Sequence, residues 1–325
     1  MPNVLETPFQ DYLEAKYHID ERSLNPSVRA RCLSEISNLA VPIGLDVGTG
    51  TGAMIRRVTG ALGHETSYWT GIDLRRDTVV AARRVTSREF AAAGYHVSTD
   101  AGSMRATKEG HTVTVDYVVG DIFDNAVRRS LIQRVERQSG IVTSHPFNVV
   151  TAHAVSDMVP LHSFVEVISG LLASGGIAYF TINYDGKTVM EPVSAEAEFE
   201  RHLLHVYNQS MDERHVNGLP VGGSRSGSRL PHVLRESGYQ VLETGPSDWR
   251  VASVGGRYGR GEKLFLTAII TMIYREGKLQ AEGRHPELNS SLLDRWYEQR
   301  RLHIRDGILR LSVGQSDIVA RRNGG

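Results

Sequence analysis

Short apolar runs recur through residues 40–185, and most of them end in glycine or acidic residues. Runs of this length with turn residues at their ends are typical of strands that are buried on both faces. The first run leads into a glycine turn, and the last follows a Gly-Gly turn. We therefore expect five strands, within Ile43–Val47, Ser67–Leu74, Val115–Phe123, Phe147–Ala154 and Leu171–Ile182.

Segments with the helical period lie before, between and after these strands. Asn25 is placed to cap one of them, because Pro26 follows it at the first helical position. Strands that alternate with helices at this spacing indicate βαβ units and a parallel sheet. We expect helices at Asp11–Asp20, Pro26–Ile36, Ala53–Val58, 195–215, Ser228–Ser237, Glu262–Glu276 and Pro286–His303.

Three other segments have a weaker pattern. The polar segment Ala93–Gly110 contains three glycines and is expected to be a loop. Tyr239–Thr244 is expected to be the sixth strand. Ser247–Val251 and the tail Leu309–Arg321 are alternatives for the last strand, since the alternation in the tail is broken.

The glycine turn after the first strand carries the clearest chemical signal. The sequence there is Asp46-Val47-Gly48-Thr49-Gly50-Thr51-Gly52, and a helix is expected to begin directly after it. Glycines allow a positive φ and let a ligand approach the backbone closely. Helix N-termini offer free N–H groups to such a ligand. The turn therefore predicts a site for a nucleoside-type cofactor.

The spacing of the glycines distinguishes between cofactors. Dinucleotide enzymes use G-x-G-x-x-G, and their pyrophosphate lies at the helix N-terminus. Here the pattern is G-x-G-x-G, with Ala53 after the last glycine. Asp46 would meet a pyrophosphate badly but would suit a cation, such as the ammonium group of a bound amino acid.

Acidic residues follow the next two strands at βαβ spacing. Asp73 ends the second strand, where an acid can bind ribose hydroxyls, and Asp121 ends the third. Together with the glycine turn, this series resembles the class I S-adenosylmethionine-dependent methyltransferases over about residues 40–185. The resemblance implies an α/β fold with a Rossmann-like, doubly wound sheet of seven mostly parallel strands. It implies S-adenosyl-L-methionine as cofactor, bound by Asp46, Gly48, Thr49, Gly50, Asp73, Leu74, Asp121, Ile122 and Ala152.

Further segments precede and follow the residues of that core in the sequence. We expect a helical N-terminal cover at 1–39 and the core at 40–255, with a lid insertion at about 185–237. A C-terminal helical extension at 256–325 would pack on the core. We expect the N-terminal cover and the lid insertion to close over the site at the ligand-facing edge of the sheet.

Composition narrows the function classes. The 325 residues carry no formal net charge, so the basic footprint of a nucleic-acid-binding domain is lacking. The single Cys32 fits a reducing compartment, and no signal-peptide pattern or membrane-length apolar run is present. We expect a cytoplasmic protein with a small-molecule substrate and no nucleic-acid or membrane partner, and leave a homodimer open.

Candidate catalytic residues follow the fourth and fifth strands. His153 is the first choice for a proton acceptor because imidazole titrates near neutrality, and Asp157 is placed to orient it. Asp185 is the second choice. No metal is expected, since no HExxH motif or Cys/His cluster appears. Candidate substrate contacts are Tyr12, Lys16, Tyr184, Tyr207 and Arg214.

The sequence thus predicts a methyltransferase that transfers a methyl group directly to an O, N or C atom of a small molecule. An Asn/Asp-Pro-Pro-Tyr/Phe motif is lacking after the fourth strand, which argues against an amino group of adenine or glutamine as target. The alternatives are an NAD(P)-dependent oxidoreductase and a non-catalytic partner protein with the methyltransferase fold.

Overall fold

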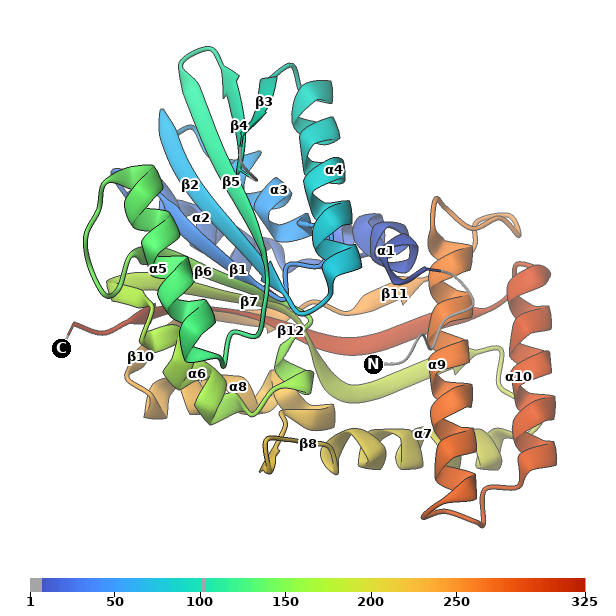
Figure 1. Ribbon diagram of the computed structural model, residues 1–325. Helices are drawn as coiled ribbons and strands as arrows, with labels where there is room; N and C mark the ends of the chain where they lie inside the picture. Colours follow the sequence, from blue (N-terminus) through green and yellow to red (C-terminus); the bar gives the residue numbers. More distant parts are fainter. Residues whose placement is uncertain (1–7, 101–102, 325) are drawn as a thin grey trace.

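One large sheet organises the chain in the computed structural model, which describes residues 8–100 and 103–324 (Figure 1). A separate two-stranded hairpin consists of β8 (His215–Val216) and β9 (Leu219–Pro220). The strands of the large sheet are β1 (Ile43–Val47), β2 (Thr66–Asp73), β3 (His96–Asp100), β4 (Ser103–Lys108), β5 (His111–Val119), β6 (Phe147–His153), β7 (Leu172–Glu191), β10 (Tyr239–Pro246), β11 (Trp249–Val251) and β12 (Arg310–Arg322).

The strand order is β10-β12-β7-β6-β1-β2-β5-β4-β3, and β11 pairs with β12 beside this path. Strands β5, β2, β1, β6 and β7 run parallel to one another. The chain leaves β1 toward β2 on one side and returns to β6 on the other, so a topological switch point lies at β1. Ligands of open α/β sheets bind at the carboxyl ends of the strands at such a point.

Helices cover both faces of the sheet, so the predicted doubly wound α/β fold is confirmed (Figure 1). One face packs against α2 (Pro26–Ser37), α3 (Ala53–Thr59) and α4 (Arg76–Ala92). The opposite face packs against α5 (Asn125–Ser139), α6 (Leu161–Ser169) and α8 (Ser226–Glu236). The predicted cap of α2 is also confirmed, because the Asn25 side chain accepts hydrogen bonds from the N–H groups of Ser27 and Val28.

A second apolar core lies beyond the parallel strands. The extended ends of β7 and β12 pack there against α1 (Phe9–Ser23), α7 (Ala197–Asp212), α9 (Glu262–Glu282) and α10 (Ser290–Arg305). Figure 1 shows α9 and α10 side by side at this end of the molecule, with α7 crossing them. A buried ion pair joins α7 to α10, since the Arg300 Nη2 atom lies 2.6 Å from the Glu200 carboxylate.

The sheet has ten strands, which is more than the expected seven. The segment Ala93–Gly110 was expected to be a loop, but it contains the antiparallel strands β3 and β4 that extend the sheet beyond β5. Residues 101 and 102 of this segment lie outside the described residues. The pair β3–β4 has a polar sequence because β3 is an edge strand. The apolar Met104 and Ala106 of β4 face the core.

The tail of the chain forms a strand of the sheet. β12 lies between β7 and β10 and is antiparallel to both. Two register shifts interrupt its pairing, between Val313 and Gln315 and between Ser316 and Ile318, which explains the broken alternation in the sequence. The expected C-terminal helical extension therefore applies to α9 and α10 and not to the tail.

Two expectations about the covering segments need correction. The predicted lid at 185–237 includes α8, but Leu230, Val233 and Leu234 of α8 are buried against the sheet. The predicted cover at 1–39 includes α2, which also packs on a sheet face. Residues 1–7 of that cover lie outside the described residues. The domain boundaries stay predictions.

Candidate functional site

The glycine turn has the backbone conformation that its sequence predicts. Gly48, Gly50 and Gly52 have φ values of 66°, 53° and 80°, which side chains rarely allow. A Cβ atom at Gly48 would lie 2.5 Å from the Cγ2 atom of Val155, which follows β6. The turn therefore brings bare backbone to the switch point of the sheet.

Asp46 lies beneath this turn at the end of β1. Its side chain is buried, and its two oxygens accept hydrogen bonds of 2.6 Å from the Thr49 and Thr151 hydroxyls. Burial raises the pKa of Asp46 to about 6, against the effect of these two hydrogen bonds. Asp46 shapes the turn in this arrangement, and the predicted direct contact with a cofactor is not favoured by its burial.

Asp73 connects the end of β2 to the glycine turn. Its Oδ2 atom accepts a 2.9 Å hydrogen bond from the Gly50 N–H, and its Oδ1 atom accepts one of 2.8 Å from the Arg75 N–H. Each carboxylate oxygen keeps a further lone pair for another donor. The adjacent Leu74 side chain is 70% exposed, which leaves apolar surface beside the carboxylate.

The third expected cofactor contact, Asp121, follows the neighbouring strand β5. Asp121 is half-buried, and its Oδ1 atom accepts a 2.9 Å hydrogen bond from the Phe123 N–H. Ile122 and Ala152 are buried, at the ends of β5 and β6. Because β1, β2 and β5 are adjacent and parallel, the glycine turn, Asp73 and Asp121 form one row along the carboxyl edge.

Helix α1 covers this edge, as predicted for the N-terminal segment (Figure 1). A Cβ atom at Gly50 would lie 3.1 Å from the Leu13 Cδ1 atom of α1. The Tyr12 ring stacks on Phe265 of α9 at 6.2 Å between centroids. The cover is therefore held between the glycine turn and the second core.

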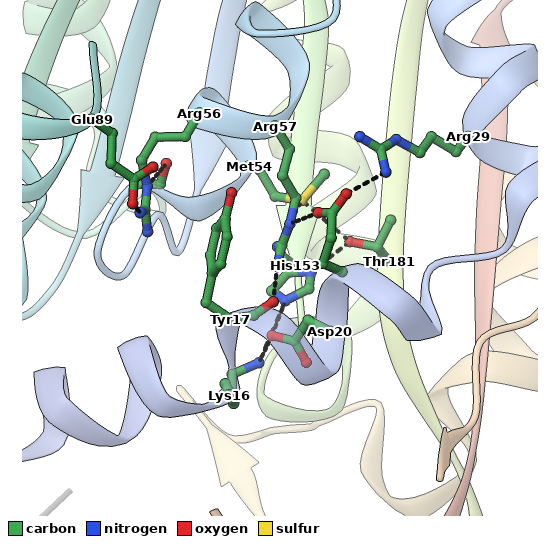
Figure 2. Close-up of polar contacts among 12 residues, drawn as sticks. Lys16, Tyr17, Asp20, Arg29, Met54, Arg56, Arg57, Glu89, His153 and Thr181 are labelled. Carbon is green, nitrogen blue, oxygen red and sulfur yellow. Dashed lines mark hydrogen bonds and ion pairs between the residues drawn. The ribbon is translucent and has the colours of Figure 1, made fainter. Parts of the chain in front are cut away.

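A buried polar cluster joins α1 to the end of β6 (Figure 2). The Asp20 Oδ2 atom lies 2.7 Å from Lys16 Nζ and 2.9 Å from His153 Nε2. The other ring nitrogen of His153, Nδ1, lies 2.7 Å from the Thr181 hydroxyl. The Asp20 Oδ1 atom accepts a 2.8 Å hydrogen bond from Trp249 Nε1. Both nitrogens of the imidazole thus have partners within the protein.

The charges in this cluster are set by burial and by each other. Burial and the Lys16 ammonium lower the pKa of His153 to about 4, although Asp20 opposes the shift. Burial would raise the pKa of Asp20, but Lys16 and His153 hold it below its usual value. A neutral imidazole next to a carboxylate donates its Nε2–H to Asp20 and accepts from Thr181 at Nδ1. This arrangement does not favour His153 as proton acceptor.

Asp157 does not orient His153, so that part of the prediction is wrong. The partners of the imidazole are Asp20 and Thr181, while Asp157 lies in the 3-10 turn Ser156–Met158 that follows β6. Burial raises the pKa of Asp157 to about 6. No hydrogen bond from another side chain reaches its carboxylate within residues 8–100 and 103–324.

Asp185 lies apart from the other candidates. It is exposed on β7 and accepts a 3.1 Å hydrogen bond from the Ser228 N–H of α8. It lines an open hollow of about 920 Å³ together with residues of β7, β12 and α8. Neighbouring residues of a strand point to opposite faces, and Tyr184 contacts α7 on the other side. The structure does not bring Asp185 to His153 or Asp157.

Four of the five expected substrate contacts lie near one another, but the ammonium of the fifth, Lys16, is buried against Asp20. Burial raises the pKa of Tyr12 and of Tyr207, and the charge of Asp157 adds to both shifts, so the three groups lie within electrostatic reach of one another. Tyr184 donates a 2.8 Å hydrogen bond to the Asn208 side chain of α7. The Arg214 Nη2 atom lies 3.3 Å from Glu276 of α9, and its charge reaches Tyr207.

Several residues at the site were not predicted from the sequence. Asp20 was assigned only to a helix, and Arg56 and Arg57 of α3 were not singled out. Both arginines are buried and contact α1. The signal for these contacts was the unusual pair of basic residues in the helix that directly follows the glycine turn.

The described part of the chain contains neither a metal-binding cluster nor a membrane-spanning helix. No group of three or more His, Cys, Asp or Glu side chains there could hold a metal ion. No described helix is long and apolar enough to cross a membrane.

The chain is similar in structure to solved proteins, although its sequence has no match among families or curated proteins. No protein-family model and no curated protein sequence matches the chain. A candidate methyltransferase of Bacillus halodurans is 16% identical and aligns over 92% of this chain and 100% of its own, with a TM-score of 0.47.

Two further similar structures have different activities in their names. A S-adenosylmethionine-dependent methyltransferase of Thiobacillus denitrificans, solved with S-adenosyl-L-homocysteine, is 14% identical over 94% of this chain and 96% of its own, with a TM-score of 0.41. The [4+2]-cyclase SpnF is 15% identical over 94% of this chain and 81% of its own, also with a TM-score of 0.41. Similarities this distant carry no argument about the reaction.

Proposed function

We propose that this chain is an S-adenosylmethionine-dependent methyltransferase that acts on a small molecule. The observation that carries the proposal is the row formed by the glycine turn, Asp73 and Asp121 at the ends of β1, β2 and β5, with α1 above it. The cofactor would supply a methyl group that its sulfonium charge already activates. The chain's residues would bind it, align it with the acceptor and exclude water.

The residues present fit such a cofactor. Gly48 and Gly50, at positive φ, present backbone without side chains of their own to the methionine part. Asp73 has lone pairs left for ribose hydroxyls. The exposed Leu74 would be covered by the adenine ring, which explains an exposed apolar side chain next to a carboxylate. The Oδ2 atom of Asp121 would accept from the exocyclic amine.

Among the carboxylates, Asp157 is better placed than His153 to accept a proton. The residues before it contact both sides of the site, since Val155 approaches Gly48 and the Ser156 carbonyl approaches Gly222 of the lid segment. A carboxyl group with a pKa of about 6 accepts a proton near neutral pH. The tyrosines and Arg214 around it would bind the acceptor, whose reacting atom is O, N or C. The cytoplasmic location and the homodimer stay predictions.

Two other functions compete with this proposal. An NAD(P)-dependent oxidoreductase is disfavoured by the G-x-G-x-G spacing, and Gly52 is followed by Ala53 where the helix begins. A partner protein without catalysis would need neither the free Asp157 carboxylate nor the polar side chains around it.

Calorimetry with S-adenosyl-L-homocysteine, S-adenosyl-L-methionine and NADH tests the proposal. We expect binding of the first two and none of NADH. Asp73→Ala should weaken binding by about tenfold or more, since hydrogen bonds to a charged group contribute about 1.5–3 kcal/mol. The matched control Asp306→Ala removes an exposed carboxylate at the end of α10 and should leave affinity unchanged. Binding of NADH without binding of S-adenosyl-L-homocysteine would overturn the proposal.

A further inference from the structure

Helix α1 stacks on α9 through Tyr12 and pairs with it through Arg22 and Glu262. Two further polar clusters attach α1 to the core, and the first is on α3. We call this set of contacts the arginine clamp: Arg56 and Arg57 of α3 with Glu14, Tyr17 and Glu21 of α1. Figure 2 labels Arg56, Arg57 and Tyr17 of this clamp. Arg56 Nη2 lies 2.8 Å from Glu14, and Arg57 Nε lies 2.8 Å from Glu21. Arg57 also donates a 2.8 Å hydrogen bond to the Tyr17 carbonyl. The two guanidinium carbons lie 4.5 and 4.4 Å from the Tyr17 ring centre.

The second attachment is centred on Asp20. Its carboxylate accepts from three donors that belong to three elements: Lys16 of α1, His153 of β6 and Trp249 of β11. The Asp20 side chain is 2% exposed and that of Lys16 is 6% exposed. Asp20 therefore joins the cover to two separate strands of the core through one carboxylate.

The two attachments respond differently to separation. Glu14 and Glu21 of the clamp are 30% and 36% exposed, so water can replace them when α1 moves. Water cannot reach the Asp20 cluster in the same way, and an ion pair that loses one buried partner leaves an uncompensated charge. The docking of α1 thus depends more on Asp20 than on the clamp.

The attached helix lies directly over the proposed ligand. Leu13 approaches Gly50 from above, and the clamp arginines belong to the helix that begins at Gly52. A ligand on the glycine turn would be enclosed between β1, α3 and α1. Separation of α1 from the turn would uncover this ligand and let it exchange more readily.

We propose that Asp20 is a positioning residue that fastens α1 over the glycine turn, so that release of this residue's three hydrogen bonds controls exchange of the bound cofactor. The proposal rests on the proposed function for the identity of the ligand. The attachment itself is a property of the chain without ligand.

Hydrogen exchange of the ligand-free protein tests the attachment. In Asp20→Asn the side chain keeps one acceptor oxygen for three donors, and Lys16 loses its counter-charge. We expect amide exchange in α1 to become about tenfold faster or more, while exchange in α2 stays unchanged. Trp249→Phe removes one donor and should give a smaller increase. This milder variant keeps the test valid if Asp20→Asn does not fold.

A matched control uses another carboxylate between helices. Asp294 of α10 accepts from Tyr274 at 2.7 Å and lies 2.6 Å from Lys278 Nζ, both in α9. Asp294→Asn should leave exchange in α1 unchanged. Equal exchange in α1 for wild type, Asp20→Asn and Trp249→Phe would overturn the proposal.

Binding kinetics separate control of exchange from simple loss of structure. Surface plasmon resonance with S-adenosyl-L-homocysteine should show that both the association and the dissociation rate constants rise in Trp249→Phe, by about threefold or more. Damage to the binding site would raise dissociation alone, and that result would contradict the proposal. If wild type does not bind this ligand, the proposed function fails, while hydrogen exchange still decides whether Asp20 fastens α1.

Discussion

Replacing Asp46 with asparagine should stabilise the protein at neutral and higher pH. The Asp46 carboxyl is 1% exposed, and burial raises its pKa from the ordinary 3.8 to about 6. Each unit of such a shift corresponds to about 1.4 kcal/mol, so ionised Asp46 destabilises the folded chain by up to about 3 kcal/mol. Asparagine has the shape of the protonated acid. It can accept from one threonine hydroxyl and donate to the other.

The gain should depend on pH in one direction. Above about pH 6 the carboxyl is ionised in both folded and unfolded chains, and its full cost is present. As the pH falls from about 6 to about 4, the folded protein takes up a proton before the unfolded chain does. Protonation of Asp46 therefore raises the free energy of unfolding of wild type. The stability gain of Asp46→Asn over wild type should shrink toward zero at about pH 4.

Urea unfolding followed by circular dichroism between about pH 4 and pH 8 measures this effect. We expect Asp46→Asn to raise the free energy of unfolding at about pH 8 by about 2–3 kcal/mol. The control Asp306→Asn changes an exposed carboxyl whose pKa is lowered by Arg305, and it should give no gain. A variant that is less stable at about pH 8, or a difference that does not change with pH, would refute the reasoning.

Three further changes test other parts of the structure. Asp73→Ala should lower the free energy of unfolding by about 1–3 kcal/mol in urea, because the Gly50 and Arg75 N–H groups lose their charged acceptor. Gly50→Ala should weaken S-adenosyl-L-homocysteine binding in calorimetry and cost about 1–2 kcal/mol of stability, since φ is 53° there; unchanged values would contradict a strained turn. Glu200→Gln should destabilise the protein by about 3–5 kcal/mol, because Arg300 stays buried without its charged partner. The dissociation constant for S-adenosyl-L-homocysteine should not change in this variant. A larger dissociation constant in that variant would show that the second core and the ligand site are coupled.

The parallel half of the fold could be predicted from the sequence because its signals are local. Strands such as β1 and β6 are mostly apolar and almost completely buried, since both faces are covered by helices. The hairpin of β3 and β4 could not be distinguished from a loop, because edge strands are polar and short. β12 was ambiguous because its two register shifts break the alternation on which the prediction depends.

The candidate site shows the same division. The residues of the glycine turn and the acids after β2 and β5 were predicted, because their roles follow from position along a βαβ unit. The partners of His153 could not be predicted, since Asp20 is distant in sequence and its burial depends on how α1 packs. Asp185 was misplaced because the sequence does not show that β7 continues to Glu191 and turns this side chain to the opposite face.

The position of β12 has a consequence for synthesis of the protein. β7 and β10 are separated in the finished sheet by a strand that is made only after α9 and α10. Until that strand arrives, a nascent chain holds β7 with an unpaired edge and β10 without a neighbour in the sheet. Unpaired edges of this kind can pair with other chains, and contacts between distant segments form slowly. We expect the growing chain to bind a chaperone through this gap, and a ribosome stalled before residue 310 to present an aggregation-prone sheet.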